Sequence, residues 1–267
     1  MKAALNILHL TDLHLFKDPN QTLAGINPRL ALKAVLQDLA KRQNHITPDA
    51  IFLTGDLSQD CSEESYRTAY KMLTKAFSGV PIIATSGNHD HPKHFKTYFG
   101  DNCGVFDNLA GFTGWRFIVL NSQQPGKVAG ALNKDNLELL AKGLTGTKRP
   151  IAVITHHHLF PVGSEWLDNI GMINYNKWQL LIKHCPNVRL VLSGHVHQET
   201  SSIYRGVTYL TTPATSWQFM LHHDDFKLDY QMPGYRWLKF TAAGNVFSHV
   251  IRVPHRAKLL PKDIKGY

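Results

Sequence analysis

The chain has 267 residues, which is the length of one large domain or two small ones and is enough for a substantial buried core. Its content of 43% hydrophobic and 18% charged residues excludes a disordered chain, and no run approaches the ~18 consecutive apolar residues of a membrane-spanning helix. The net charge of +9 is spread along the chain, and this distribution fits an anionic substrate as well as it fits nucleic acid.

Short apolar runs rich in β-formers alternate with amphipathic segments, which predicts a layered α/β domain. Strands are predicted at Leu5–Leu10, Ala50–Thr54, Ile82–Thr85, Phe117–Asn121, Ile151–Thr155, Leu190–Leu192, Thr208–Leu210, Trp237–Phe240 and Val246–Arg252. Helices are predicted from Pro28 onward and at Glu63–Phe77, Lys134–Lys142 and Tyr175–His184. No repeat or linker interrupts the pattern, so a single domain over residues 1–267 is expected, with the last dozen residues as a loosely held tail.

The first two helices have the clearest start signals. Asn27 suits the N-cap of the first helix, and Pro28 suits its first turn. Ser62 is the predicted cap of the second helix. The apolar stripe of the first helix is expected to comprise Leu30, Ala34, Leu36 and Leu39.

The three cysteines are Cys61, Cys103 and Cys185, an odd number without close pairing, which disfavours a disulfide framework. The residues after Met1 are too few and too polar for the core of a signal peptide. Reduced thiols and a cytoplasmic location are therefore expected.

Five predicted strands end in Asp, Asn or His residues, mostly beside a glycine that permits a tight turn. In chain order these residues are Asp12 and His14, then Asp56, then Asn88, His89 and Asp90, then His156, His157 and His158, and finally His195 and His197. Because sites in open α/β sheets form at the carboxyl ends of strands, the five loops can converge.

The residue types suit two divalent or trivalent metal ions. Asp12 and His14 are two residues apart, so on extended backbone their side chains leave the same face; His195 and His197 repeat the spacing. A carboxylate such as Asp56 can bridge two ions. No cysteine stands among these residues, which disfavours a structural thiolate zinc site and favours a catalytic one. Oxygen and nitrogen donors are compatible with iron, manganese or zinc.

Each motif alone is also typical of an ordinary feature. Gly55-Asp56 is a common turn, and the Gly-Asn-His-Asp segment at residues 87–90 could be a polar turn. Along the three consecutive histidines, alternation turns only one face toward a site. The polar run at residues 222–225 is interpreted as a surface loop. The five motifs together, each at a strand end, favour a metal centre.

In this order the motifs resemble those of the calcineurin-like metallophosphoesterases, over about Ile7 to His197. The resemblance implies a two-sheet β-sandwich core flanked by helices, a four-layer αββα fold. It implies one metal held by Asp12, His14, Asp56 and His197, and a second held by Asp56, Asn88, His156 and His195.

The same resemblance implies roles toward the substrate. His89 is expected to face the substrate phosphate as a catalytic residue, and Asp90 is expected to support it. The residues expected to line the substrate site are His14, Asp56, Asn88, His89, His156 and His197. Family members usually have His-His-Pro-Pro where this chain has His156-His157-His158-Leu159, so His157 stays the alternative to His156 as ligand.

A narrower resemblance, to bacterial class III cyclic AMP phosphodiesterases, covers most of the chain. It rests on the segments at residues 11–16, 55–60, 164–168, 194–199, 212–215 and 233–236. This resemblance implies hydrolysis of 3′,5′-cyclic AMP to 5′-AMP by a metal-bridging hydroxide, with a small-molecule cyclic nucleotide as partner. Trp166, Trp217 and Phe219 are candidates for an adenine pocket by residue type alone.

Other functions compatible with the same core are hydrolysis of glycerophosphodiesters, hydrolysis of sugar-nucleotide lipids, a nuclease activity and a non-catalytic scaffold. The chain has no apolar insertion for acyl chains and little room for a DNA-binding domain, so nucleic acid is not the expected partner. A scaffold has no need for the complete ligand set present here. The sequence carries no signal for an oligomeric state.

Overall fold

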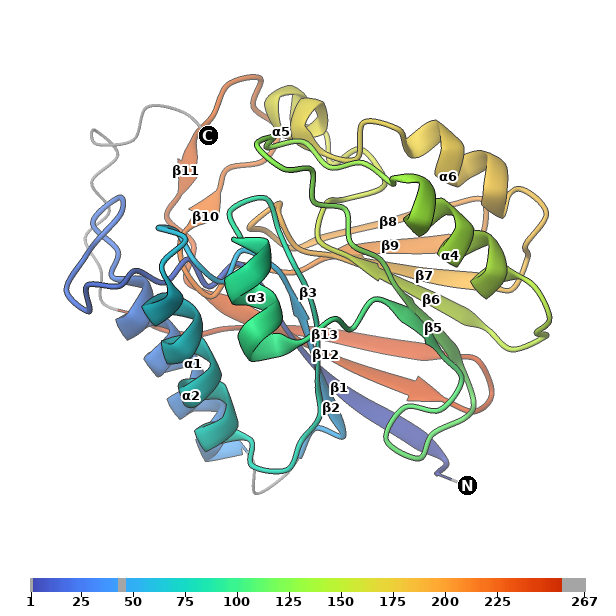
Figure 1. Cartoon of the computed structure of the whole chain (residues 1–267), viewed down its shortest axis with the longest axis horizontal. Coiled ribbons are helices and arrows are strands. Elements are labelled where there is room, and N and C mark those ends of the chain that lie inside the picture. The colour runs from blue at the N-terminus through green and yellow to red at the C-terminus, as the bar shows by residue number, and fades with distance from the viewer. Residues whose placement is uncertain (1, 43–46, 256–267) are drawn as a thin grey trace.

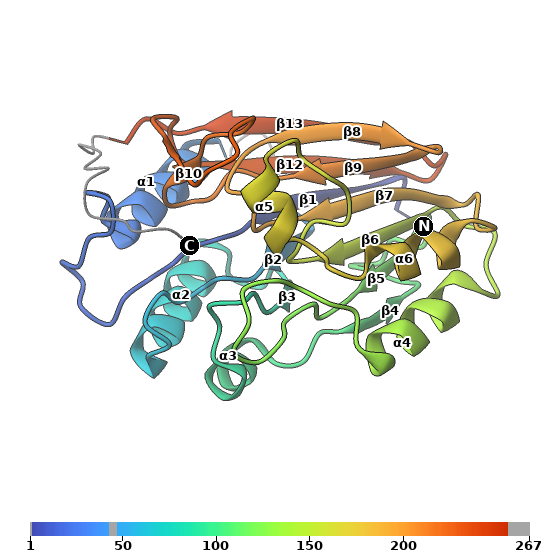
Figure 2. The same cartoon turned by 90° about the horizontal axis from the view of Figure 1, so that it is seen from above.

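The computed structural model describes residues 2–42 and 47–255 and contains two large β-sheets packed face to face (Figures 1 and 2). The predicted loose tail, residues 256–267, lies outside the described residues. The five-stranded sheet has the order β13-β12-β1-β2-β3, with β1 at Ala4–Leu10, β2 at Ala50–Thr54, β3 at Ile82–Thr85, β12 at Gly234–Thr241 and β13 at Val246–Arg252.

The six-stranded sheet has the order β4-β5-β6-β7-β9-β8. Its strands are β4 at Gly104–Phe106, β5 at Arg116–Val119, β6 at Ile151–Thr155, β7 at Val188–Ser193, β8 at Thr200–Tyr204 and β9 at Val207–Thr211. β1, β2 and β3 are parallel, and so are β5, β6, β7 and β9. The carboxyl ends of the central strands therefore point the same way within each sheet.

Helices cover the outer face of each sheet. α1 (Pro28–Arg42), α2 (Glu63–Ala76) and α3 (Pro92–Phe99) pack on the five-stranded sheet, whereas α4 (Lys134–Leu144) and α6 (Tyr175–Ile182) pack on the six-stranded sheet (Figure 1). Between the sheets, Leu5 and Ile7 of β1 meet Phe117 of β5 and Ile154 of β6. These layers confirm the predicted four-layer αββα fold.

Alternation along β1 decides which layer each side chain joins. Leu5 and Ile7 face the other sheet, while Leu8 and Leu10 face the helices. His9 belongs to the first set by the same period and is completely buried. A histidine thus stands at the end of an otherwise apolar row between the sheets.

The start of α1 was predicted correctly, and of its predicted apolar stripe Leu39 is buried, Ala34 and Leu36 pack partly buried against the same core, and Leu30 is wrong. Asn27 accepts a hydrogen bond from the backbone N–H of Leu30 through its side chain at 3.0 Å, and Ser62 caps α2 by accepting from the N–H of Ser65. The buried residues of α1 are Pro28, Ala31, Leu32, Val35 and Leu39. Leu30 is 54% exposed, because the sheet meets a helix face one residue further round.

Several short elements were not predicted. α3 follows directly on the Gly-Asn-His-Asp loop, with His91 at its N-cap and Phe95 and Phe99 buried one turn apart. α5 (Glu165–Ile170), β4, β8 and the two-residue strands β10 (Gln218–Phe219) and β11 (Leu228–Asp229) are also absent from the prediction. Elements of this length depend on their packing partners, and β4 and β8 are edge strands paired on one side only.

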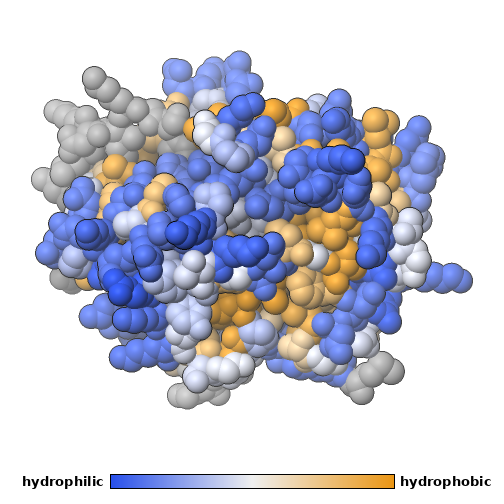
Figure 3. All heavy atoms as spheres, viewed as in Figure 1, coloured by the Kyte–Doolittle hydropathy of each residue, from blue (hydrophilic) through white to orange (hydrophobic). Residues whose placement is uncertain are grey.

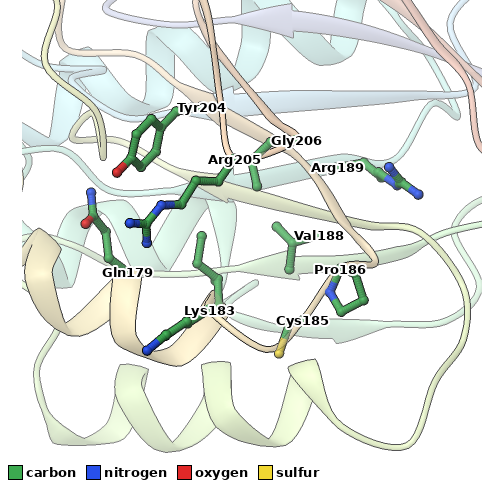
Figure 4. A pocket seen from close by; sticks show the side chains of 11 residues that line it. Gln179, Lys183, Cys185, Pro186, Val188, Arg189, Tyr204, Arg205 and Gly206 are labelled. Carbon is green, nitrogen blue, oxygen red and sulfur yellow. The ribbon is translucent and has the colours of Figure 1, made fainter.

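The face shown in Figure 3 is largely hydrophilic, with apolar atoms visible between α3 and α4. Among the described residues no helix has the length and apolarity needed to cross a membrane. A cavity of about 350 Å³ lies between the end of α6, the start of β7 and the β8–β9 turn. Arg205 stacks on Tyr204 at this turn, with 5.1 Å from its guanidinium carbon to the ring centroid (Figure 4). None of the predicted metal ligands lines this cavity.

Candidate metal centre

The five polar loops meet where the parallel strands of both sheets end. Asp12 and His14 follow β1, and the loop after β2 lies alongside them. The N–H of Asp12 donates to the carbonyl of Gly55 at 3.0 Å, and the N–H of His14 donates to the carbonyl of Asp56 at 2.9 Å. From the other sheet, the N–H of Gly194 donates to the carbonyl of His156 at 3.0 Å.

The backbone at these residues is not extended, so the geometric reason given for pairing Asp12 with His14 is wrong. Their φ angles are +55° and +48°, and His195 and His197 have φ of +64° and +51°. Left-handed backbone is rare for residues other than glycine and gathers at functional sites. The chain turns sharply at each of these four residues, and this turn directs their side chains together.

Two glycines permit the close approach of the loops. A Cβ at Gly87 would collide with the carboxylate of Asp56. A Cβ at Gly194 would collide with the hydroxyl of Thr11 and lie 2.9 Å from Oδ2 of Asp12. Both positions therefore require glycine, because a side chain would begin where the Asp56 carboxylate lies at Gly87 and where the Thr11 hydroxyl lies at Gly194.

The first group of donor atoms comprises Asp12, His14 and His197, all completely buried. Nε2 of His14 lies 3.0 Å from Nε2 of His197, and the latter is 3.3 Å from Oδ1 of Asp12. Two neighbouring ligands at about 2.1 Å from one ion, at right angles, are about 3 Å apart. The three atoms are thus spaced as ligands of a common ion.

The second group gathers around His156. Its Nε2 lies 3.1 Å from Oδ1 of Asn88 and 3.4 Å from Oδ2 of Asp56. The ring of His195 lies close by, with its centroid 5.1 Å from that of His156. Oδ2 of Asp56 is also 3.8 Å from Nε2 of His14. One carboxylate oxygen therefore faces both groups.

Three of these histidines are oriented by acceptors behind them. Nδ1 of His14 donates to Oε1 of Gln59 at 2.6 Å, Nδ1 of His156 to the carbonyl of Thr54 at 2.6 Å, and Nδ1 of His197 to the carbonyl of Trp217 at 2.9 Å. Since these acceptors have no proton to give, each Nδ1 carries the ring proton. Each Nε2 then points to the centre, as in metal-binding histidines. At His156 burial acts to lower the pKa, but the charge of Asp56 raises it to about 9, so a metal ion would displace the proton on Nε2 of His156.

The consecutive histidines differ in their surroundings. Nδ1 of His157 lies 2.7 Å from Oγ of Ser122, and its Nε2 donates to the carbonyl of Val128 at 2.8 Å. Nε2 of His158 lies 3.4 Å from Oδ1 of Asp168. Only His156 of the three directs a nitrogen at Asp56 and Asn88.

A metal pair fits this constellation. In the part of the chain that the structure describes, Oδ1 of Asp12, Oδ2 of Asp56 and both ring nitrogens of His195 are buried without a hydrogen-bond partner. Leaving a carboxylate oxygen buried without a partner is costly. Burial acts to raise the pKa of Asp56, but His156 and His89 hold that pKa well below its usual range. Burial lowers the pKa of His14 to about 3, so its ring is neutral, the form that binds metal.

The comparisons with known proteins agree with this geometry. The family model described as calcineurin-like phosphoesterase matches residues 5–199, which include all five polar loops. The chain belongs to this family. This phosphoesterase is accordingly an enzyme, and its family membership and clustered His and Asp side chains indicate that it binds metal.

Similar proteins span nearly the whole phosphoesterase. It is 34% identical over 268 residues to the 3′,5′-cyclic adenosine monophosphate phosphodiesterase CpdA of Pseudomonas aeruginosa, covering 99% of this chain and 96% of the relative. It is 32% identical to the protein of that name in Escherichia coli K12, covering 94% and 91%. A dimetal phosphatase from Danio rerio shares the fold, with a TM-score of 0.63 at 12% identity over 94% of this chain and 99% of that one.

At the open edge of the centre stand Asn88 and His89, which are half-buried. The backbone N–H of His89 donates to Oδ1 of Asp56 at 2.8 Å, and the His89 ring lies 5.0 Å from that of His14. Of the predicted site residues, these two are partly exposed, whereas the others are buried.

Asp90 holds the loop of the phosphoesterase that carries His89. Its carboxylate accepts hydrogen bonds from the N–H of Gly87 at 2.9 Å, the N–H of Leu57 at 3.0 Å and the hydroxyl of Tyr66 at 3.1 Å. Burial, together with the nearby charge of Asp56, raises the pKa of Asp90 to about 7. Asp90 thus connects the loops after β2 and β3 with α2.

Two aromatic candidates for a base pocket pack against histidines of the candidate centre instead. The ring of Trp217 lies 4.7 Å from that of His14, and Phe219 stacks on His197 at 4.1 Å. Trp217 is 1% exposed and Phe219 is fully buried. Trp166 packs edge-on against Phe219 at 5.1 Å. The first two therefore pack against His14 and His197 and offer no face to a nucleobase.

Proposed function

We propose that this phosphoesterase hydrolyses 3′,5′-cyclic AMP to 5′-AMP at a centre of two metal ions. The observation that carries the proposal is the position of Oδ2 of Asp56, 3.4 Å from Nε2 of His156 and 3.8 Å from Nε2 of His14. A carboxylate oxygen that lies between two groups of donor atoms, one around His14 and one around His156, is suited to join two cations. The choice of substrate is supported by the names of the relatives at 32–34% identity over most of the chain.

In this proposal Asp12, His14 and His197 would hold one ion, Asn88, His156 and His195 would hold the other, and Asp56 would contribute to both. Their oxygen and nitrogen donors suit iron, manganese or zinc. When bound, such a pair supplies an activated water and neutralises charge on the phosphoryl group. His156 is preferred to His157 because both ring nitrogens of His157 are engaged by Ser122 and Val128.

His89 is the proposed general acid. Cleavage of the P–O3′ bond leaves a basic alkoxide oxygen, which takes a proton from the His89 imidazolium as the bond breaks. Burial lowers the pKa of His89, and the negative charge of a bound phosphodiester acts in the opposite direction. Asp90 positions His89 through the loop that it holds, with hydrogen bonds to the N–H groups of Gly87 and Leu57.

The rival function of a non-catalytic scaffold differs from this proposal in that it does not need a complete set of metal ligands. The anchor protein GAP50 of the Plasmodium inner membrane complex has a similar fold, with a TM-score of 0.58 at 13% identity, so the fold itself also serves an anchor. The complete set of converging donors favours catalysis here.

Three free cysteines support the proposed cytoplasmic location. A single domain over residues 1–267 is part of the same proposal.

A panel of substrates tests the proposal with the metal-loaded protein. It contains cyclic AMP, cyclic GMP, a 2′,3′-cyclic nucleotide, a nitrophenyl phosphodiester and a glycerophosphodiester. We expect turnover of cyclic AMP with 5′-AMP as the product. Turnover of the nitrophenyl diester with none of any cyclic nucleotide would reject the substrate and keep the metal-dependent hydrolase.

A further inference from the structure

His9 is a buried histidine that the proposed chemistry does not use. It lies in β1 three residues before Asp12, on the face that meets the other sheet, and is fully buried. Burial and the nearby guanidinium of Arg236 lower the pKa of His9 well below its usual value, so the ring is neutral. A neutral imidazole carries one donor and one acceptor nitrogen.

Both ring nitrogens of His9 are engaged by threonine hydroxyls. Nε2 lies 2.7 Å from Oγ1 of Thr54, and Nδ1 lies 2.6 Å from Oγ1 of Thr212. Beyond Thr54 the contacts continue to a ligand of the metal centre. Oγ1 of Thr54 lies 2.9 Å from Oγ1 of Thr11, which lies 2.7 Å from Oδ2 of Asp12. At the other end, Nε of Arg236 donates to Oγ1 of Thr212 at 3.1 Å.

The direction of every hydrogen bond follows from the carboxylate end. Oδ2 of Asp12 can only accept, so the Thr11 hydroxyl donates to it; the carbonyl of Thr54, at 3.0 Å, is a second acceptor for that proton. The Thr11 oxygen must then accept from the hydroxyl of Thr54. Thr54 in turn accepts from Nε2–H of His9.

The remaining bonds are fixed in the same way. With its proton on Nε2, neutral His9 accepts at Nδ1 from the hydroxyl of Thr212. The Thr212 oxygen is then left to accept from Arg236, which is able only to donate. The opposite tautomer of His9 would take the Thr54 proton and leave the two hydroxyl oxygens of Thr54 and Thr11 in contact at 2.9 Å with no proton between them.

We infer that His9 is a positioning residue for the metal centre. It completes a chain of hydrogen bonds from Arg236 to Asp12 in which each group donates to the next one in the same direction. Aligned hydrogen bonds in a buried, low-dielectric setting strengthen one another. Oδ2 of Asp12 accepts from Thr11 and also from the N–H of His195 at 3.1 Å, which leaves Oδ1 to face His197. The inference rests on the proposed metal centre and adds the residue that orients one of its carboxylates.

The test is the affinity of metal-stripped protein for Mn²⁺, measured by calorimetric titration. His9→Leu removes both contacts, and Thr54→Val removes one hydroxyl of the chain with little change of shape. We expect each to bind Mn²⁺ about 10-fold more weakly, the lower end of the loss seen when supporting partners of metal ligands are removed. His9→Gln keeps one acceptor and one donor in sequence and should stay within about 2-fold of wild type.

Tyr235→Phe is the matched control, because it deletes a buried hydroxyl bonded to Asp38 at 2.7 Å that has no path to Asp12. It should lower the unfolding temperature by about 2 °C and leave Mn²⁺ affinity unchanged. Wild-type affinity in Thr54→Val, or equal losses in His9→Gln and His9→Leu, would overturn the role of His9. Absence of Mn²⁺ binding by the wild-type protein would instead refute the metal centre. If His9→Leu does not fold, Thr54→Val decides.

Discussion

Asp56→Asn separates the structural role of Asp56 from its role as a shared ligand. The substitution keeps an Oδ1 that accepts from the N–H of His89, now 2.8 Å from it, and replaces Oδ2 by an amide that cannot join two cations. In metal-free protein the fold should change little, within about 1 kcal/mol, because His156 can release its proton when the neighbouring charge is gone. Both ions, however, lose their common ligand.

The size of the effect follows from linkage. An ion present at 100 times its dissociation constant stabilises the folded state by about 2.7 kcal/mol. At about 2 °C per kcal/mol for a domain of this size, one ion raises the unfolding temperature by about 5 °C and two by about 10 °C. Differential scanning fluorimetry with and without Mn²⁺ should show that rise in wild type and lose most of it in Asp56→Asn. An equal rise in both proteins would refute the sharing of Asp56.

The other predictions concern single side chains. His156→Ala should lose one metal equivalent by elemental analysis, whereas His157→Ala should retain both; the reverse would make His157 the ligand. His89→Ala should slow cyclic AMP hydrolysis about 10²–10⁴-fold and affect a nitrophenyl diester much less, since nitrophenolate departs without a proton. Equal losses would indicate phosphate positioning, and lost metal would make His89 a ligand. Gln59→Leu should weaken Mn²⁺ binding about 10-fold by freeing the ring of His14; unchanged affinity would contradict that role.

The parts of the centre that could be predicted from sequence are those carried by local pattern. Asp12, Asp56, Asn88 and His156 each follow a recognisable apolar strand, and parallel strands place their ends together. The left-handed backbone that directs Asp12 could not be predicted, because it depends on the N–H of Asp12 bonding to Gly55 in the neighbouring loop.

The supporting contacts were missed because they join distant residues. Gln59 lies 45 positions from His14 and Thr212 lies 203 positions from His9, so no spacing in the sequence marks either pair. Gln59 lies within residues 55–60, a segment that resembles the cyclic AMP phosphodiesterases, and this resemblance is the sequence signal that could have pointed to a role for Gln59. The error at Leu30 has a similar origin: periodicity predicts a buried face, and the sheet decides which residues form it.

The most direct measurement is a titration of metal-stripped protein with Mn²⁺ while the conversion of cyclic AMP is followed by chromatography of the nucleotides. Two ions sharing Asp56 predict that 5′-AMP formation rises until two equivalents are bound and then stays constant. Full activity at one equivalent, or in the stripped protein, would contradict the dinuclear centre; two bound equivalents with no conversion of cyclic AMP would contradict the proposed substrate.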